Sequence, residues 1–138
     1  MEIFAAYAHA IAALALWAML MTVLGGLSTR GRTAENRCDC GKPKRDYANK
    51  VYRADRAFMN AIETSGPFIA ATLAAILSGA SPFWVNLFAS VFIVARAIMA
   101  YVHIGTTNQP MRSAFWSVGL LCIVCLAVMA ITAAVVGA

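Results

Sequence analysis

The chain has 138 residues, of which 62% are hydrophobic and only 12% are charged, and its formal net charge is +5. A soluble domain carries about 25% charged residues, so this composition excludes an ordinary soluble protein. Nine of the eleven Lys and Arg residues fall between Arg30 and Arg56. No nucleic-acid-binding module accompanies this basic stretch, so we expect no nucleic-acid partner.

Four apolar segments follow one another along the chain, each longer than the ~20 residues that a helix needs to cross a bilayer. We predict helices at about residues 3–27, 46–78, 82–105 and 112–137, because backbone groups in lipid must be hydrogen-bonded within their own segment. The first segment lacks a basic N-terminal region, so we expect a retained helix and not a signal peptide. The predicted fold class is an all-α membrane protein, a single four-transmembrane-helix bundle over residues 1–138.

The connections predict how the bundle lies in the membrane. The loop at about residues 28–45 is long and basic, and the third connection, near residues 105–111, lies on the same face of the membrane. The positive-inside rule places that face in the cytoplasm. We therefore expect an integral, multi-pass membrane protein whose basic loop is cytoplasmic and which contacts anionic lipids there. Where the second helix extends into water, we expect Arg53 and Asp55 to be solvated; contact of Tyr52 and Arg53 with the site is the alternative.

Polar residues inside the apolar segments are few and regularly spaced. Arg56, Asn60 and Glu63 share one face of the second helix, and Arg96 lies seven residues before His103 in the third. Glu63 and Arg96 should reach a similar depth, about 10 Å below the mouth of the bundle at 1.5 Å per residue. An ionisable residue near the bilayer centre costs ~2.5–3.5 kcal/mol on insertion scales, so these residues should be paired or functional.

Two interpretations remain for these charges. The structural one is a Glu63–Arg96 ion pair that only locks the bundle. The functional one is a pocket for a small anion that also carries an amine, because Arg56, His103 and Arg112 would surround the mouth. Arginine binds carboxylates in a bidentate manner and a glutamate would hold an ammonium group. Glutathione fits this inventory, and so would an amino acid or a phosphate-bearing lipid.

The segments VYRADRAFMNAIETSGPF (residues 51–68) and VARAIMAYVHIGTTNQPMRSAFW (residues 94–116) resemble a known family. It comprises the membrane-associated proteins in eicosanoid and glutathione metabolism (MAPEG), which include the microsomal glutathione transferases. The first segment resembles the family's R-A-x-x-N-x-x-E-x-x-x-P-F signature. The second resembles its third helix and the loop that follows. His103 departs from the tyrosine that the family often has there, and Thr64 from a tyrosine found in some members.

The resemblance implies a homotrimer with a glutathione site between neighbouring subunits, open to the cytoplasmic side. It implies a microsomal-type glutathione transferase with glutathione as co-substrate, a lipophilic electrophile arriving from the lipid, and no metal. The residues that it assigns to glutathione binding are Arg30, Arg56, Asn60, Glu63 and Arg96. For His103, which departs from the family pattern, we expect contact with glutathione at the mouth, and interfacial packing is the alternative. We expect Arg112 to be catalytic, because an arginine beside the sulfur favours the thiolate, which is the nucleophile. Reduction of lipid hydroperoxides would use the same site.

Two other functions remain as alternatives. A small four-helix multidrug transporter also carries a membrane-embedded glutamate, but arginines around Glu63 would repel its cationic cargo. A non-catalytic glutathione- or lipid-binding membrane protein would share the same residues. Of the four cysteines, we expect Cys38 and Cys40 to be free thiols in the loop, with a redox or transient metal-binding role as the alternative. We expect Cys122 and Cys125 to be small apolar residues of a helix.

Overall fold

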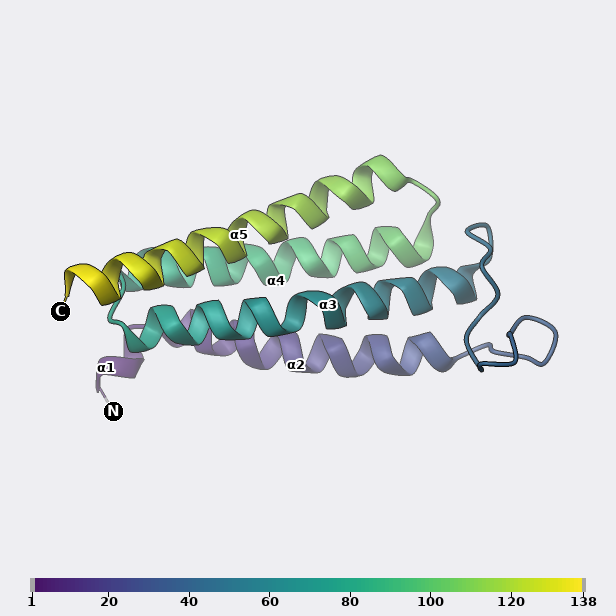
Figure 1. The fold of residues 1–138 in the computed structure, drawn as a ribbon, viewed down its shortest axis with the longest axis horizontal. Helices are drawn as coiled ribbons and strands as arrows, with labels where there is room; N and C mark the ends of the chain where they lie inside the picture. The colour runs from purple at the N-terminus through teal and green to yellow at the C-terminus, as the bar shows by residue number, and fades with distance from the viewer. Residues whose placement is uncertain (1, 138) are drawn as a thin grey trace.

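The computed structural model describes residues 2–137 and consists of helices joined by one long loop (Figure 1). A single turn, α1 (Glu2–Ala5), precedes four long helices: α2 (Ala8–Thr29), α3 (Lys50–Leu77), α4 (Pro82–Gly105) and α5 (Gln109–Val136). Each long helix is long and apolar enough to cross a membrane. Within residues 2–137 the only β-type pairing is an isolated bridge between Arg37 and Pro43. The prediction of an all-α chain with four membrane-spanning helices is confirmed.

The four helices pack as a bundle in which α2 and α5 each contact both α3 and α4. Small residues line the contacts, including Ala57, Ala75 and Ala89, which are fully buried. Side chains of this size allow helix backbones to approach closely. Three aromatic rings fill the centre: Phe68 stacks on Phe92 with ring centroids 3.7 Å apart, and Trp17 and Phe92 form an edge-to-face pair with centroids 5.1 Å apart.

The two ends of the bundle carry different connections and termini. Figure 1 shows the long loop between α2 and α3 at the same end as the α4–α5 connection, with both termini at the opposite end. Toward the loop end the ribbon of α5 also separates from that of α4 (Figure 1). The long loop and the start of α5 therefore lie at the same end of the bundle.

The helix boundaries differ from the predicted ones where capping side chains intervene. The Asn49 side chain accepts a hydrogen bond from the Val51 N–H at 2.9 Å, so α3 begins at Lys50 and not near residue 46. Asn108 accepts from the Met111 N–H at 3.1 Å in the same way. The last helix therefore begins three residues earlier than predicted.

The first predicted helix is interrupted between α1 and α2. The Tyr7 hydroxyl donates to the main-chain oxygen of Ala80, at the turn between α3 and α4. The Asn86 side chain donates to the Ala6 oxygen at 2.7 Å and accepts from the Ala10 N–H at 2.9 Å. Because one amide of α4 satisfies backbone groups on both sides of the break, the chain can leave the helical path there without leaving them unpaired.

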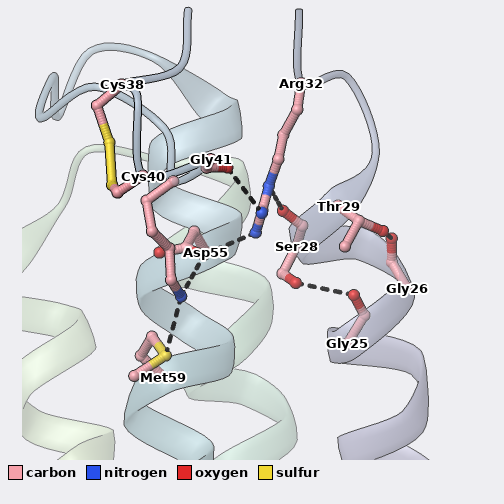
Figure 2. A network of polar contacts seen from close by, with 11 residues as sticks. Gly25, Gly26, Ser28, Thr29, Arg32, Cys38, Cys40, Gly41, Asp55 and Met59 are labelled. Atoms are coloured by element: carbon pink, nitrogen blue, oxygen red, sulfur yellow. Dashed lines mark hydrogen bonds and ion pairs between the residues drawn. A yellow bond between two sulfur atoms is a disulfide. The ribbon is translucent and has the colours of Figure 1, made fainter.

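The beginning of α3 is buried, and the expectation that Arg53 and Asp55 are solvated is wrong. Arg53 is 7% exposed and donates to the main-chain oxygen of Ile104 at 3.2 Å. Asp55 is 5% exposed and accepts from Arg32 at 2.8 Å and from Lys42 at 3.3 Å (Figure 2). The physical reason is that the basic loop folds back over α3, so its cations replace water around the carboxylate.

The expectation of free thiols in the loop is also wrong, because the structure joins Cys38 and Cys40 in a disulfide (Figure 2). Cys122 and Cys125 in α5 remain free, the first buried and the second half-buried, in line with their role as small apolar residues.

Candidate functional site

A polar cavity of about 460 Å³ lies at the loop end of the bundle. It draws residues from the loop, α3, α4 and the start of α5. Three of them, Arg56, His103 and Arg112, were predicted as site residues from the sequence. Its lining contains three arginines and no carboxylate, so it favours an anionic ligand, and we call it the cationic cavity. The lining residues are Arg45, Tyr47, Tyr52, Arg56, His103, Gln109 and Arg112.

Arg112 lies in the first turn of α5, where it is half-buried. Its Nη1 lies 3.5 Å from the Tyr47 hydroxyl and its Nη2 lies 3.3 Å from the Ser113 hydroxyl. Both contacts are long, and no carboxylate within residues 2–137 forms an ion pair with this guanidinium. Since arginine has five N–H donors, most of its capacity remains available to a ligand in the cavity.

His103, in the last turn of α4, is 3% exposed. Neither ring nitrogen has a hydrogen-bond partner within the described part of the chain. Its ring lies beside that of Tyr47, with centroids 6.0 Å apart. A buried polar group without a partner is destabilising by about 1–3 kcal/mol. Because His103 borders the cavity, a bound ligand can supply the missing partner.

Arg96 lies deeper, inside the bundle, and does not border this cavity. It is 2% exposed, and its Nη2 donates to the main-chain and side-chain oxygens of Asn60 at 3.0 and 2.8 Å and to the Thr64 hydroxyl at 2.9 Å. The guanidinium carbon also lies 5.8 Å from the centroid of the Trp17 ring, within range of a cation–π contact. On α5, Gly119 leaves room for the Arg96 side chain, since a Cβ there would lie 2.9 Å from Cδ.

Glu63 points the other way. It lies in α3 between Asn60 and Thr64, so it shares the depth of Arg96 as expected, but its side chain is exposed. Within residues 2–137 no ion pair joins Glu63 to Arg96, and the structural interpretation that depended on this pair is wrong. The reason is orientation: Arg96 enters between Asn60 and Thr64, whereas Glu63 lies on the outer face of α3.

Arg30 lies at the end of α2, where it is exposed. It borders a separate cavity of about 280 Å³ between α2, α3 and α4. A single chain thus brings together Arg56, His103 and Arg112. It leaves Arg30, Glu63 and the Asn60–Arg96 pair outside the cationic cavity.

Three residues of the cavity were not predicted: Arg45, Tyr47 and Gln109. Tyr52, whose contact with the site was the alternative to a solvated position, borders the cavity; it precedes Arg56 by four residues and so shares its helical face. Arg45 and Tyr47 belong to the loop, whose path over the bundle has no periodicity from which to predict it. Gln109 is the first residue of a helix that begins earlier than expected.

The fold and the cavity together define a membrane-spanning four-helix protein with a cationic site at one end. The sequence matches the profile of the MAPEG family over residues 4–132, which is nearly the whole chain, and the chain therefore belongs to this family. The resemblance noted from the sequence is confirmed. A search of curated proteins finds no significant match to the chain.

Proposed function

We propose that this chain is a membrane-bound glutathione transferase that activates glutathione as its thiolate for conjugation to lipophilic electrophiles. The observation that carries this proposal is the cationic cavity, in which the half-buried Arg112 faces the same space as Arg56 and the unpartnered His103. Membership of a family that contains glutathione transferases supports the choice of ligand. The same site would serve for reduction of lipid hydroperoxides by glutathione.

The roles within the cavity follow from the chemistry of each side chain. Arg56 is suited to a carboxylate of glutathione, which it can bind in a bidentate manner. His103 would donate or accept one hydrogen bond at the cavity wall. Arg112 would lie beside the sulfur, where its charge lowers the thiol pKa from its usual value near 8.5. The thiolate then attacks the electrophile, a C–S bond forms and the leaving group departs with its electron pair.

Four residues outside the cationic cavity would contribute to glutathione binding only when subunits assemble: Asn60, Glu63, Arg96 and Arg30. Glu63 is an exposed carboxylate in an apolar span, which is costly in lipid and calls for a covering surface. Its position is consistent with a homotrimer in which a neighbouring subunit covers the outer face of α3. A ligand between subunits could then reach Glu63 and the amide of Asn60 from this side, with Arg30 at the rim, while Arg96 holds Asn60 from inside the bundle.

The membrane orientation is part of the same proposal. We place the loop end, with the cationic cavity, on the cytoplasmic side, because the basic residues of the chain are concentrated there. Glutathione would enter from that side and the electrophile would arrive laterally from the lipid.

The test is turnover by the detergent-purified protein with glutathione and either an aryl halide or an organic hydroperoxide. We expect glutathione-dependent conjugation, and glutathione binding by calorimetry. Binding without turnover would support the alternative of a non-catalytic binding protein. Absence of both would contradict the proposal. The transporter alternative loses support because the cavity carries three arginines and no carboxylate, which disfavours a cationic cargo.

A further inference from the structure

A second reactive feature lies in the loop, outside the cationic cavity. Cys38 and Cys40 form a disulfide that encloses a single residue, Asp39 (Figure 2). The Cys38 N–H donates to the Lys42 oxygen at 2.8 Å, and the Gly41 N–H donates to the Cys38 oxygen at 2.9 Å. Gly41 has φ of +80°, which suits glycine and closes this tight turn. The two sulfurs are thus presented at the tip of an ordered turn.

This disulfide contributes little to the fold. Stabilisation by a cross-link grows with the length of chain that it closes, and here it closes one residue. Other contacts hold the loop: the Lys44 N–H donates to the Asn36 oxygen at 2.8 Å, and Asp55 pairs with Arg32 and Lys42. The bond can therefore open while the loop keeps its path over α3.

A cavity of about 440 Å³ lies beside Cys38 and is lined also by Arg37 and Asp39. Both charged side chains are exposed, and within residues 2–137 neither forms an ion pair. One cation and one anion at a single cavity match a ligand that carries a carboxylate and an ammonium group. No group of three or more potential metal ligands lies here in the described part of the chain, so the two sulfurs lack the further ligands that a zinc site requires.

We propose that Cys38 and Cys40 form a thiol–disulfide exchange site for small zwitterionic thiols of the amino-acid type. Arg37 would bind the carboxylate of such a thiol and Asp39 its ammonium group. The cytoplasmic orientation proposed above, on which this step rests, favours exchange over a permanent bond, because cytosolic disulfides are usually transient and either catalytic or redox-sensing. This inference goes beyond the proposed transferase function and uses none of the residues of the cationic cavity.

The exchange is balanced in two steps. The thiolate of the small thiol attacks the Cys38 sulfur, a mixed disulfide forms, and Cys40 leaves as a thiolate that takes up a proton. A second small thiolate attacks the sulfur that the first small thiol contributed to the mixed disulfide. Cys38 then leaves as a thiolate and takes up a proton. Two small thiols are oxidised to one disulfide and the protein cystine is reduced to two thiols. The reverse sequence, with a small disulfide as oxidant, restores the cystine.

The experiment uses the detergent-purified full chain with Cys122→Ala and Cys125→Ala, so that only the loop cysteines report. The protein is equilibrated at a series of ratios of reduced to oxidised glutathione, quenched with acid, alkylated and weighed by mass spectrometry. We expect the alkylated fraction to rise from none to two groups across the series. In a further Cys40→Ser variant we expect one glutathione adduct on Cys38. Loop thiols that stay fully alkylated at every ratio would overturn the proposal.

Two variants test the recognition. Arg37→Gln and Asp39→Asn should each slow reduction by glutathione about threefold, the effect of a partly exposed charge pair. Reduction by 2-mercaptoethanol, which has neither a carboxylate nor an ammonium group, should change less. Equal slowing with both thiols would show that the cavity does not bind the zwitterion. Exchange should be unaffected by Arg112→Ala, so the two proposals can fail separately.

Discussion

Arg96 and Asn60 form the shortest hydrogen bond between α4 and α3 within residues 2–137: one guanidinium nitrogen donates to the main-chain and the side-chain oxygen of Asn60, at 3.0 and 2.8 Å. Arg96 is almost fully buried, and removing a guanidinium from water costs several kcal/mol unless hydrogen bonds replace the solvent. These bonds therefore determine how the two helices meet directly below the cationic cavity.

The hydroxyl of Thr64 contributes a third bond to the same nitrogen, at 2.9 Å. Thr64→Val keeps the shape of the side chain but removes this acceptor from a buried cation. We expect the free energy of unfolding to fall by about 1.5–3 kcal/mol, the range for hydrogen bonds to charged groups. Thr22→Val is the matched control, because the Thr22 hydroxyl bonds only within its own helix. Thermal unfolding in detergent measures both, and equal shifts would contradict the interhelical role of Thr64.

Gly119 should be intolerant of a side chain. A Cβ there would lie 2.9 Å from Cδ of Arg96, whose guanidinium is fixed on α3 and cannot easily withdraw. We expect Gly119→Ala to lower the free energy of unfolding by about 1–3 kcal/mol, as overpacking does. Gly26→Ala meets nothing within 4 Å and should be neutral or slightly stabilising. A Gly119→Ala protein as stable as the Gly26→Ala protein would show that Arg96 can move.

Arg112→Ala should separate catalysis from binding. We expect conjugation of an aryl halide to fall by about tenfold or more, because the thiol pKa returns toward 8.5 and less thiolate is present at neutral pH. Glutathione affinity should change less, since other groups bind the carboxylates. Lys44→Ala, which removes an exposed positive charge of the same loop end, is the control. Unchanged turnover would remove Arg112 from the mechanism.

Glu63→Gln should weaken glutathione binding by about fivefold, the effect of one partly exposed charge pair. The substitution keeps the size of the side chain, so packing within the proposed trimer should persist. Calorimetric titration provides the affinity, and chemical cross-linking provides the oligomeric state. Glu35→Gln changes an exposed loop carboxylate and should leave both unchanged. If affinity is the same in both variants, Glu63 has a structural role only.

Asp55→Asn should loosen the basic loop. The carboxylate is buried and holds Arg32 at 2.8 Å and Lys42 at 3.3 Å, and an amide cannot balance their two charges. We expect trypsin to cleave the loop about tenfold faster, which corresponds to a loss of 1.4 kcal/mol. Asp46→Asn is the control, because the Asp46 carboxylate bonds only to the Ala48 N–H of its own turn. Cleavage at the wild-type rate would show that other contacts hold the loop.

The amino-acid sequence by itself determined the four membrane-spanning segments and the family. In lipid a single segment can satisfy its own backbone hydrogen bonds only as a helix, and these apolar segments are as long as a spanning helix, so their length is enough to predict the helices. Helical periodicity also placed Arg56, Asn60 and Glu63 on neighbouring positions of one helix. It placed Glu63 and Arg96 at one depth, because the rise per residue is constant.

Only the tertiary structure decided which of these residues share a site. Periodicity gives a residue its face on one helix but not the helix that packs against that face. Arg96 therefore turned out to be bound inside the bundle, while Glu63 at the same depth is exposed. The loop shows the same limit: Arg32 reaches Asp55 across 23 residues and Tyr47 lies against His103, contacts that no local pattern encodes. These contacts form because the loop folds back over α3, where its charged side chains replace the water around buried groups of the helix.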